Sequence, residues 1–160
     1  MSILDELNVE QRKAAEKIEG PVLILAGAGS GKTRTVTYRI AHMIKEMGIS
    51  PLNILALTFT NKAAKEMKER AEQLVGSDSH NLAISTFHSF AVRLLKTYAD
   101  RIGYGRNFNI YDVDDQKSLI GKIIKELNIN SDEISPSKVA NRISKLKEDG
   151  IGVKELEKEI

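Results

Sequence analysis

Residues 22–33 read VLILAGAGSGKT, and this segment constrains the fold more than any other part of the chain. A short apolar run, typical of a strand that is buried on both faces, leads into a glycine-rich turn and then into a helix-like pattern. Because glycine lacks a Cβ, such a turn can direct its backbone N–H groups inward, where the positive end of the following helix also points. The segment therefore predicts an α/β fold with a phosphate-binding loop between a strand and a helix.

Individual residues of this loop have distinct expected roles. We expect Lys32 to reach the terminal phosphates and the Thr33 hydroxyl to hold Mg²⁺. The expected backbone cradle consists of Ala26, Gly27, Ala28, Gly29, Ser30 and Gly31. The usual pattern G-x-x-x-x-G-K-[ST] has glycine where this chain has Ala26, so a glycine-rich turn without a ligand is the alternative. Three glycines followed by Lys-Thr, between a strand and a helix, argue against that alternative.

Composition limits the classes of protein to which the chain can belong. With 24 basic and 22 acidic residues, the net charge indicates no partner, and any nucleic-acid site must come from a local arrangement. The sequence contains no cysteine, which excludes disulfides and thiolate metal sites and fits the cytoplasm. We find no secretory signal, and no apolar run approaches the roughly 20 residues that cross a bilayer, so we expect no membrane partner.

The first two thirds of the sequence predict repeated strand–helix units. Three apolar segments, 22–26, 54–59 and 82–86, are each followed by apolar residues at helical spacing. This alternation predicts three parallel strands with right-handed crossovers and flanking helices. Before the first strand, Asn8 with Gln11 three positions later predicts a capping box at the start of a helix.

The character of the sequence changes near residue 105, after which we expect helices alone. Ser135 and Pro136 fit the N-cap and first residue of one of them. Asp112 and Asp115 are expected at a helix N-terminus rather than at a metal. A P-loop ATPase also needs a second buried strand that ends in an acidic residue, and we find none. We therefore expect the chain to be a fragment that ends before this strand.

Four motifs, in this order along the chain, resemble the UvrD/PcrA/Rep helicases of superfamily 1: LNVEQRKA at 7–14, AGAGSGKT at 26–33, TFTNKAAKEM at 58–67 and STFHSF at 85–90. That family commonly has alanine at the Ala26 position. The resemblance implies that residues 1–105 form the first part of a RecA-like, ATP-binding P-loop NTPase domain. It implies that residues 106–160 begin a helical accessory domain, which is truncated.

The resemblance also implies a function. Helicases of this family use ATP and Mg²⁺ to move 3′→5′ along single-stranded DNA and to unwind duplexes at their junctions, in repair or replication. This chain would then hold the N-terminal ATP- and DNA-binding portion, and the remainder of the same polypeptide would supply the second motor domain. On this basis we expect ATP turnover near background for the 160 residues by themselves.

Further residue roles are implied by the same resemblance. Gln11 would contact the adenine edge, and Arg34 would lie beside the base. Residues after the second and third strands would contact single-stranded DNA: Phe59, Thr60, Asn61, Thr86, Phe87 and His88. Structural alternatives exist for three of these residues: Gln11 as a capping residue, Phe59 as the last core residue of its strand, and His88 as a structural histidine.

Other functional classes remain open at this level. A small P-loop nucleotide or metabolite kinase would share the phosphate loop, but it has no need of Gln11 ahead of the loop or of the TFTN and TFHS segments. A non-catalytic binding module would keep the loop as structure alone. Within the helicase class, a helicase–nuclease of the AddA or RecB type would share these motifs and differ in its C-terminal region.

Overall fold

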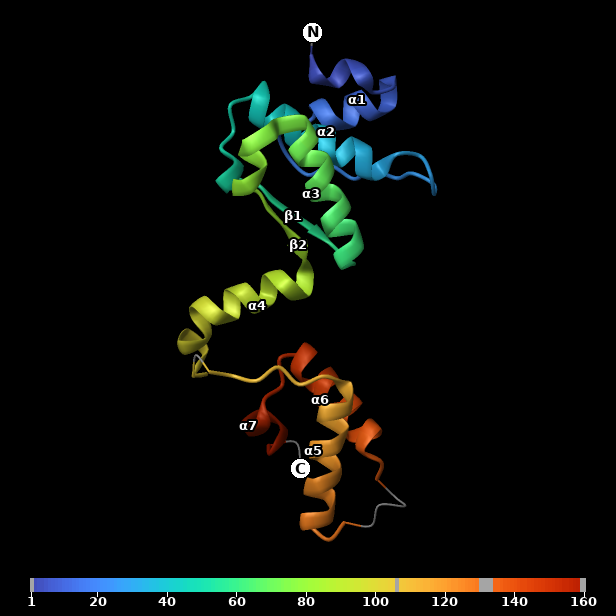
Figure 1. The fold of residues 1–160 in the computed structure, drawn as a ribbon. Coiled ribbons are helices and arrows are strands. Elements are labelled where there is room, and N and C mark those ends of the chain that lie inside the picture. The colour runs from blue at the N-terminus through green and yellow to red at the C-terminus, as the bar shows by residue number, and fades with distance from the viewer. Residues whose placement is uncertain (1, 106, 130–133, 159–160) are drawn as a thin grey trace. The chain divides into compact units, whose positions relative to one another are not determined.

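The computed structural model describes residues 2–105, 107–129 and 134–158. The chain divides into two units, Met1–Arg106 and Asn107–Ile160, each of which is described by itself (Figure 1). The first unit contains, in order, η1 (Ile3–Glu6), α1 (Val9–Glu16), α2 (Lys32–Lys45), η2 (Pro51–Asn53), β1 (Leu55–Thr58), α3 (Asn61–Val75), η3 (Gly76–Asn81), β2 (Ala83–Thr86), α4 (Phe87–Tyr98) and η4 (Ala99–Ile102).

Two parallel strands form the sheet of the first unit. β1 and β2 pair in a register that sets Leu55 opposite Ala83 and Thr58 opposite Thr86. These strands confirm the predictions at 54–59 and 82–86, and α3 lies between them in the sequence as the crossover element. Because the strands are parallel, both carboxyl ends meet at one edge of the sheet, from which α3 and α4 continue.

The predicted third strand at 22–26 is wrong. Within the described residues the sheet has two strands, and this segment pairs with neither of them. The side chains of Leu23 and Leu25 are 82% and 85% exposed, whereas the prediction required burial on both faces. An apolar run becomes a buried strand only where a neighbouring strand takes up its backbone hydrogen bonds and helices cover its faces. The described elements supply neither a pairing strand nor helices that cover both faces of this segment.

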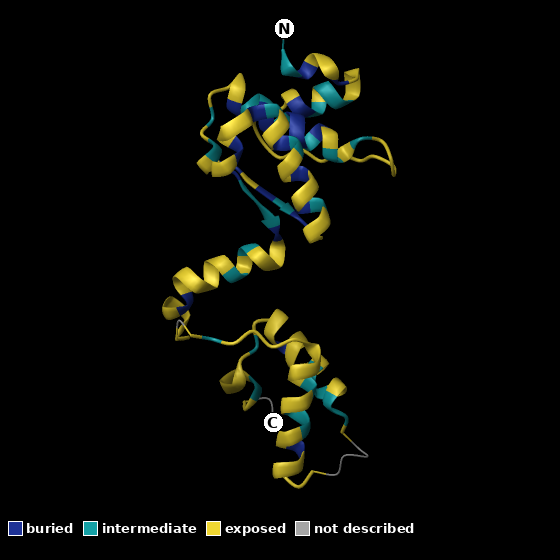
Figure 2. Cartoon of the chain, in the orientation of Figure 1, coloured by how far each residue is buried: buried dark blue, intermediate teal, exposed yellow. Residues whose placement is uncertain are grey.

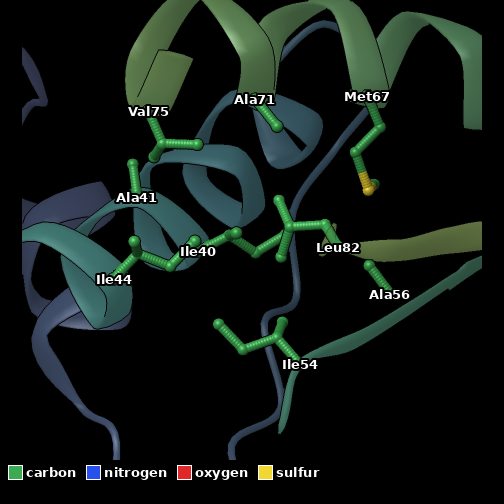
Figure 3. Close-up of a cluster of buried hydrophobic side chains, with 9 residues drawn as sticks. All are labelled: Ile40, Ala41, Ile44, Ile54, Ala56, Met67, Ala71, Val75 and Leu82. Atoms are coloured by element: carbon green, nitrogen blue, oxygen red, sulfur yellow. The ribbon is translucent and has the colours of Figure 1, made fainter. Parts of the chain in front are cut away.

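The core of the first unit lies between α2, α3 and the sheet. On α2, Ile40 and Ile44 are one turn apart, and on α3 the buried residues Met67, Ala71 and Val75 follow the same spacing. Figure 3 shows these side chains meeting one another together with those of Ala41, Ile54, Ala56 and Leu82. Figure 2 shows the same region as the main buried part of this unit. The core thus fixes the direction of α2, which begins at the phosphate loop.

A second, smaller cluster attaches the N-terminal segment to α2. It consists of Leu4, Leu7, Ala15 and Tyr38. Arg39 adds polar contacts, because its guanidinium donates to the carbonyl oxygens of Ala14 at 2.8 Å and Ile18 at 3.4 Å. Ala14 lies in the last turn of α1, where carbonyl groups have no partner within the helix, and Ile18 follows two residues after the helix ends. The position of α1 is therefore set by α2.

The second unit consists of α5 (Val113–Glu126), α6 (Pro136–Glu148) and α7 (Val153–Leu156). α5 and α6 pack together, and the buried side chains are Ile124 and Leu146. Asp112 caps α5 in a capping box with Asp115, and Ser135 caps α6, which confirms both helix starts. Across the described parts of both units, no helix has the length and apolarity needed to cross a membrane.

Candidate functional site

The phosphate loop, residues 26–31, adopts backbone conformations that require glycine at two positions. Gly29 and Gly31 have φ angles of +76° and +87°, in the left-handed region that L-residues with side chains rarely adopt. Gly31 is also the N-cap of α2, and no side chain among the described residues caps this helix start. The first N–H groups of α2 are therefore available to an anion.

The ammonium group of Lys32 lies against this loop. Its Nζ atom donates to the carbonyl oxygens of Ala26 at 2.8 Å and Gly27 at 2.6 Å. The Ser30 hydroxyl also donates to the Gly27 oxygen, at 2.7 Å. A phosphate carries a full negative charge and makes stronger hydrogen bonds with an ammonium group than a neutral carbonyl does. In this position, the Lys32 ammonium group can exchange its hydrogen bonds with two neutral carbonyls for stronger ones with a phosphate.

Gln11 reaches the same loop from α1. Its Oε1 atom accepts the Asn8 N–H at 3.3 Å, and its Nε2 atom donates to the Ser30 carbonyl at 2.9 Å. The Asn8 side chain in turn accepts the Gln11 N–H at 2.9 Å, which confirms the predicted capping box. A cavity of about 210 Å³ has Gln11, Ala26, Ser30 and Lys32 in its lining. The structure thus brings the first motif and the phosphate loop to one pocket.

Arg34 does not line this pocket. Its guanidinium donates to the Glu6 carbonyl at 2.9 Å and lies 5.2 Å from the centre of the Tyr38 ring. It lines a second pocket, also of about 210 Å³, together with Tyr38 and Arg70. The Tyr38 hydroxyl donates to the Glu6 carboxylate, and this hydrogen bond, with burial, raises the pKa of Tyr38.

Thr33 follows Lys32 in the first turn of α2 and also lies outside the lining of the Gln11–Lys32 pocket.

An exposed aromatic pair marks the carboxyl edge of the sheet. Phe59 follows β1, Phe87 follows β2, and their ring centroids are 5.4 Å apart with an angle of 41° between the ring planes. The side chain of Phe59 is 90% exposed, so the alternative that it is a core residue is wrong. The parallel register of the two strands explains the pairing, since it sets Thr58 opposite Thr86 immediately before the two rings.

The polar residues at this edge fall into two groups. Asn61 and His88 are exposed. The hydroxyls of Thr60 and Thr86 act as helix caps instead: Thr60 accepts the Ala63 N–H at 3.1 Å, and Thr86 accepts the Ser89 N–H at 3.2 Å. Thr86 is buried and also donates to the Ser89 hydroxyl at 2.9 Å.

Ser89 and Arg39 did not emerge from the sequence as site residues. The hydroxyl of Ser89 is exposed at the edge and is oriented by Thr86, and the capping spacing of three residues was the available signal. Arg39 contacts backbone atoms alone, which leaves no side-chain pattern to detect. Among the described residues, no group of three or more His, Asp or Glu side chains is arranged to hold a metal ion.

Comparison with known proteins places these features in one family. The UvrD/REP helicase N-terminal domain matches residues 7–160. The chain belongs to this family. Two similar relatives are the ATP-dependent DNA helicase PcrA of Staphylococcus aureus strain Mu50, 52% identical over 146 residues, and that of Staphylococcus epidermidis strain RP62A, 53% identical over 146 residues. Both alignments cover 91% of this chain and 20% of the relative, so the chain spans about a fifth of their length.

Membership in the UvrD/REP family covers all the segments that form the candidate site. The matched residues include α1, the phosphate loop and the carboxyl edge of the sheet. Within the matched residues, the described part of the chain is rich in helices and has a small parallel sheet of two strands rather than the predicted three.

Proposed function

We propose that this chain is the N-terminal ATP- and single-stranded-DNA-binding portion of an ATP-dependent 3′→5′ DNA helicase that unwinds duplex DNA in repair or replication. The observation that carries the proposal is the pocket in which Gln11 and Lys32 meet around the phosphate loop. Family membership and two relatives named ATP-dependent DNA helicase PcrA support it.

In this proposal ATP occupies the pocket between α1 and the phosphate loop. Lys32 exchanges the carbonyl oxygens of Ala26 and Gly27 for the terminal phosphates, and the loop N–H groups bind the same oxygens. Thr33 supplies the hydroxyl for Mg²⁺, which would neutralise phosphate charge during hydrolysis. Gln11 contacts the adenine edge. Arg34, which lines the other pocket, would exchange its contact with the Glu6 carbonyl for a place beside the base.

Single-stranded DNA lies along the carboxyl edge of the sheet in this proposal. Phe59 and Phe87 offer exposed rings for base stacking, and Asn61 and His88 offer polar groups to the DNA backbone. Thr60 and Thr86, whose hydroxyls cap α3 and α4, set the direction of these groups. Such contacts carry little base information, so binding should be tolerant of sequence and sensitive to salt.

The two units have separate proposed roles. Residues 1–105 are the first part of the motor domain, and residues 106–160 begin its helical accessory domain. The remainder of the polypeptide would supply the acidic residue for Mg²⁺ and the second motor domain. ATP turnover by the 160-residue chain should therefore stay near background, while the whole protein hydrolyses ATP and unwinds duplex DNA.

Binding measurements on the 160-residue chain test this proposal. Calorimetry should detect at most weak Mg²⁺–ATP binding by the original chain, and this binding should be lost in Lys32→Ala. Fluorescence anisotropy should detect labelled single-stranded DNA at low salt, with affinity falling as salt rises. Equal DNA affinity at low and high salt would contradict the proposed DNA contacts. Phosphate transfer to a small acceptor, without DNA-stimulated hydrolysis by the whole protein, would favour the kinase instead.

A further inference from the structure

The guanidinium group of Arg34 is held by two residues that lie outside the phosphate loop. Its Nη2 atom donates to the Glu6 carbonyl at 2.9 Å and lies 3.7 Å from an oxygen of the Glu6 carboxylate. The same group lies over the Tyr38 ring, whose face attracts a cation. The Tyr38 hydroxyl donates to the Glu6 carboxylate, so the three side chains form a closed set of contacts. We call Glu6 and Tyr38 the Arg34 clasp.

Both residues of the clasp belong to anchored parts of the first unit. Glu6 is the last residue of η1, in which Leu4 is fully buried. At the other end of η1, the Ile3 N–H donates to the Glu46 carboxylate at 2.6 Å. Tyr38 is itself buried on α2. The clasp is therefore in place independently of the arginine that it holds.

The side chain of Arg34 begins at the boundary between the two pockets. A Cβ added to Gly31 would lie 2.7 Å from the Gln11 Nε2 atom and 3.9 Å from the Arg34 Cβ atom. The side chains of Arg34 and Glu6 are 47% and 60% exposed, so their contact can open into solvent. Because a long side chain changes its direction by changing rotamers, the guanidinium can leave the clasp without movement of α2.

We propose that Glu6 is a positioning residue that holds Arg34 in the clasp and thereby competes with a nucleotide base for its guanidinium group. The proposal rests on the proposed ATP-binding role of the Gln11–Lys32 pocket and adds a control on it. Because one guanidinium cannot occupy both places, a base that recruits Arg34 must break the contacts of the clasp. The apparent affinity for ATP is then lowered by the fraction of molecules in which Arg34 is held.

Glu6→Gln tests the competition, because it removes the charge that attracts Arg34 and keeps an acceptor for the Tyr38 hydroxyl. Mg²⁺–ATP should bind about two- to fivefold more tightly to this variant in NMR titrations, as expected for the loss of an exposed ion pair. Mg²⁺–tripolyphosphate has no base that could recruit Arg34, so its affinity should stay the same. ATP affinity that is unchanged or lower in Glu6→Gln would overturn the proposal, as would an equal gain for both ligands.

Two further variants separate the competition from a general effect of charge. Glu16→Gln is the matched control, because it removes one negative charge from another exposed ion pair, that with Arg12. It should leave both affinities as they are in the original chain. In Arg34→Ala the clasp has nothing to hold, so adding Glu6→Gln should leave ATP affinity unchanged. A gain of the same size with and without Arg34 would overturn the proposal.

The NMR signals of the Arg34 side chain report directly where its guanidinium lies. In the clasp this group is 5.2 Å from the centre of the Tyr38 ring, whose ring current shifts the signals of nearby protons. In the chain without ligand, Glu6→Gln should move these signals toward those of an arginine in solvent. Mg²⁺–ATP should do the same in the original chain, whereas Mg²⁺–tripolyphosphate should not.

These signals also separate failure of the inference from failure of the proposed function. Arg34 signals that respond neither to Glu6→Gln nor to bound ATP would overturn the role of Glu6. Failure of the original chain to bind either ligand would instead contradict the proposed function. The effect of Glu6→Gln on the ligand-free chain would then still decide whether Glu6 holds Arg34.

Discussion

The rings of Phe59 and Phe87 are 5.4 Å apart, although one follows β1 and the other follows β2. Aromatic rings that stack on bases typically contribute about 1–3 kcal/mol per base. We therefore expect Phe59→Ala and Phe87→Ala each to weaken single-stranded DNA binding by roughly five- to 150-fold, as measured by fluorescence anisotropy.

Leu52→Ala is the matched control for these substitutions, because Leu52 is also an exposed apolar residue but lies in η2. The Leu52→Ala variant should bind single-stranded DNA with the same affinity as the original chain. The melting temperature of Phe59→Ala should change little, since the ring is 90% exposed. Unchanged DNA affinity in both phenylalanine variants would remove the aromatic pair from the proposed DNA contacts.

Lys32→Met removes the positive charge of Lys32 but keeps an unbranched side chain at this position. Loss of charged hydrogen bonds worth about 1.5–3 kcal/mol should weaken Mg²⁺–ATP binding by roughly ten- to 150-fold in calorimetry. Lys32 is exposed, so the free energy of unfolding should change by less than about 0.5 kcal/mol. Lys45→Met, at the other end of α2, provides the control for loss of one positive charge. Equal ATP affinity in both variants would argue against a phosphate role for Lys32.

The Thr60 cap should contribute measurably to the stability of the first unit. Removing a threonine N-cap typically costs about 1 kcal/mol, so Thr60→Ala should lower the free energy of unfolding by about that amount. Urea denaturation followed by circular dichroism measures the difference. Thr60→Ser should retain most of the stability. Thr97→Ala, which removes a hydroxyl from an exposed position within α4, should cost less than about 0.5 kcal/mol.

Acid should release the N-terminal segment from α2 through Glu46. The Ile3 N–H donates to its carboxylate at 2.6 Å, and this contact, followed by those with His42 and Ser2, lowers the pKa of Glu46. A lowered pKa in the folded state gives stability that is present above the ordinary glutamate value, about 4.3, and is lost as pH falls through the lowered value. The NMR signal of the Ile3 amide should therefore shift below about pH 4.

Glu46→Gln is the control for this acid response. Its side chain cannot titrate, so the Ile3 signal should lose its dependence on pH in that range. A shift of the same size in Glu46→Gln would assign the effect to another group.

Local signals in the sequence were sufficient to predict several elements. The starts of α1, α5 and α6 followed from Asn8, Asp112 and Ser135, because a cap and its helix lie within a few residues of one another. The predictions of β1 and β2 are confirmed because each of these strands finds its pairing partner, the other strand, within the chain. The segment 22–26 has an equally apolar pattern, but the pattern cannot tell whether a neighbouring strand is available.

In the candidate site too, some relationships could be predicted from the motifs, and others depend on the folded structure. The motifs indicated that Gln11 and Lys32 serve one ligand, and the structure brings them to one pocket. The contact of Gln11 with Ser30 could not be foreseen, because it depends on the direction of a backbone carbonyl. The orientation of Arg34 depends on Glu6 and Tyr38, which belong to no motif.

Arg39 contacts main-chain oxygens rather than side chains, those of Ala14 in α1 and of Ile18 just after it. Substitutions at outward positions of α1, such as Lys13 or Glu16, leave these oxygens in place. The sequence of this helix can therefore vary at such positions while its contact with Arg39 is kept. Arg39 has no such freedom, since lysine lacks the forked guanidinium that reaches two carbonyls. In a saturation mutagenesis experiment, tolerance should therefore be broad along the outer face of α1 and narrow at Arg39.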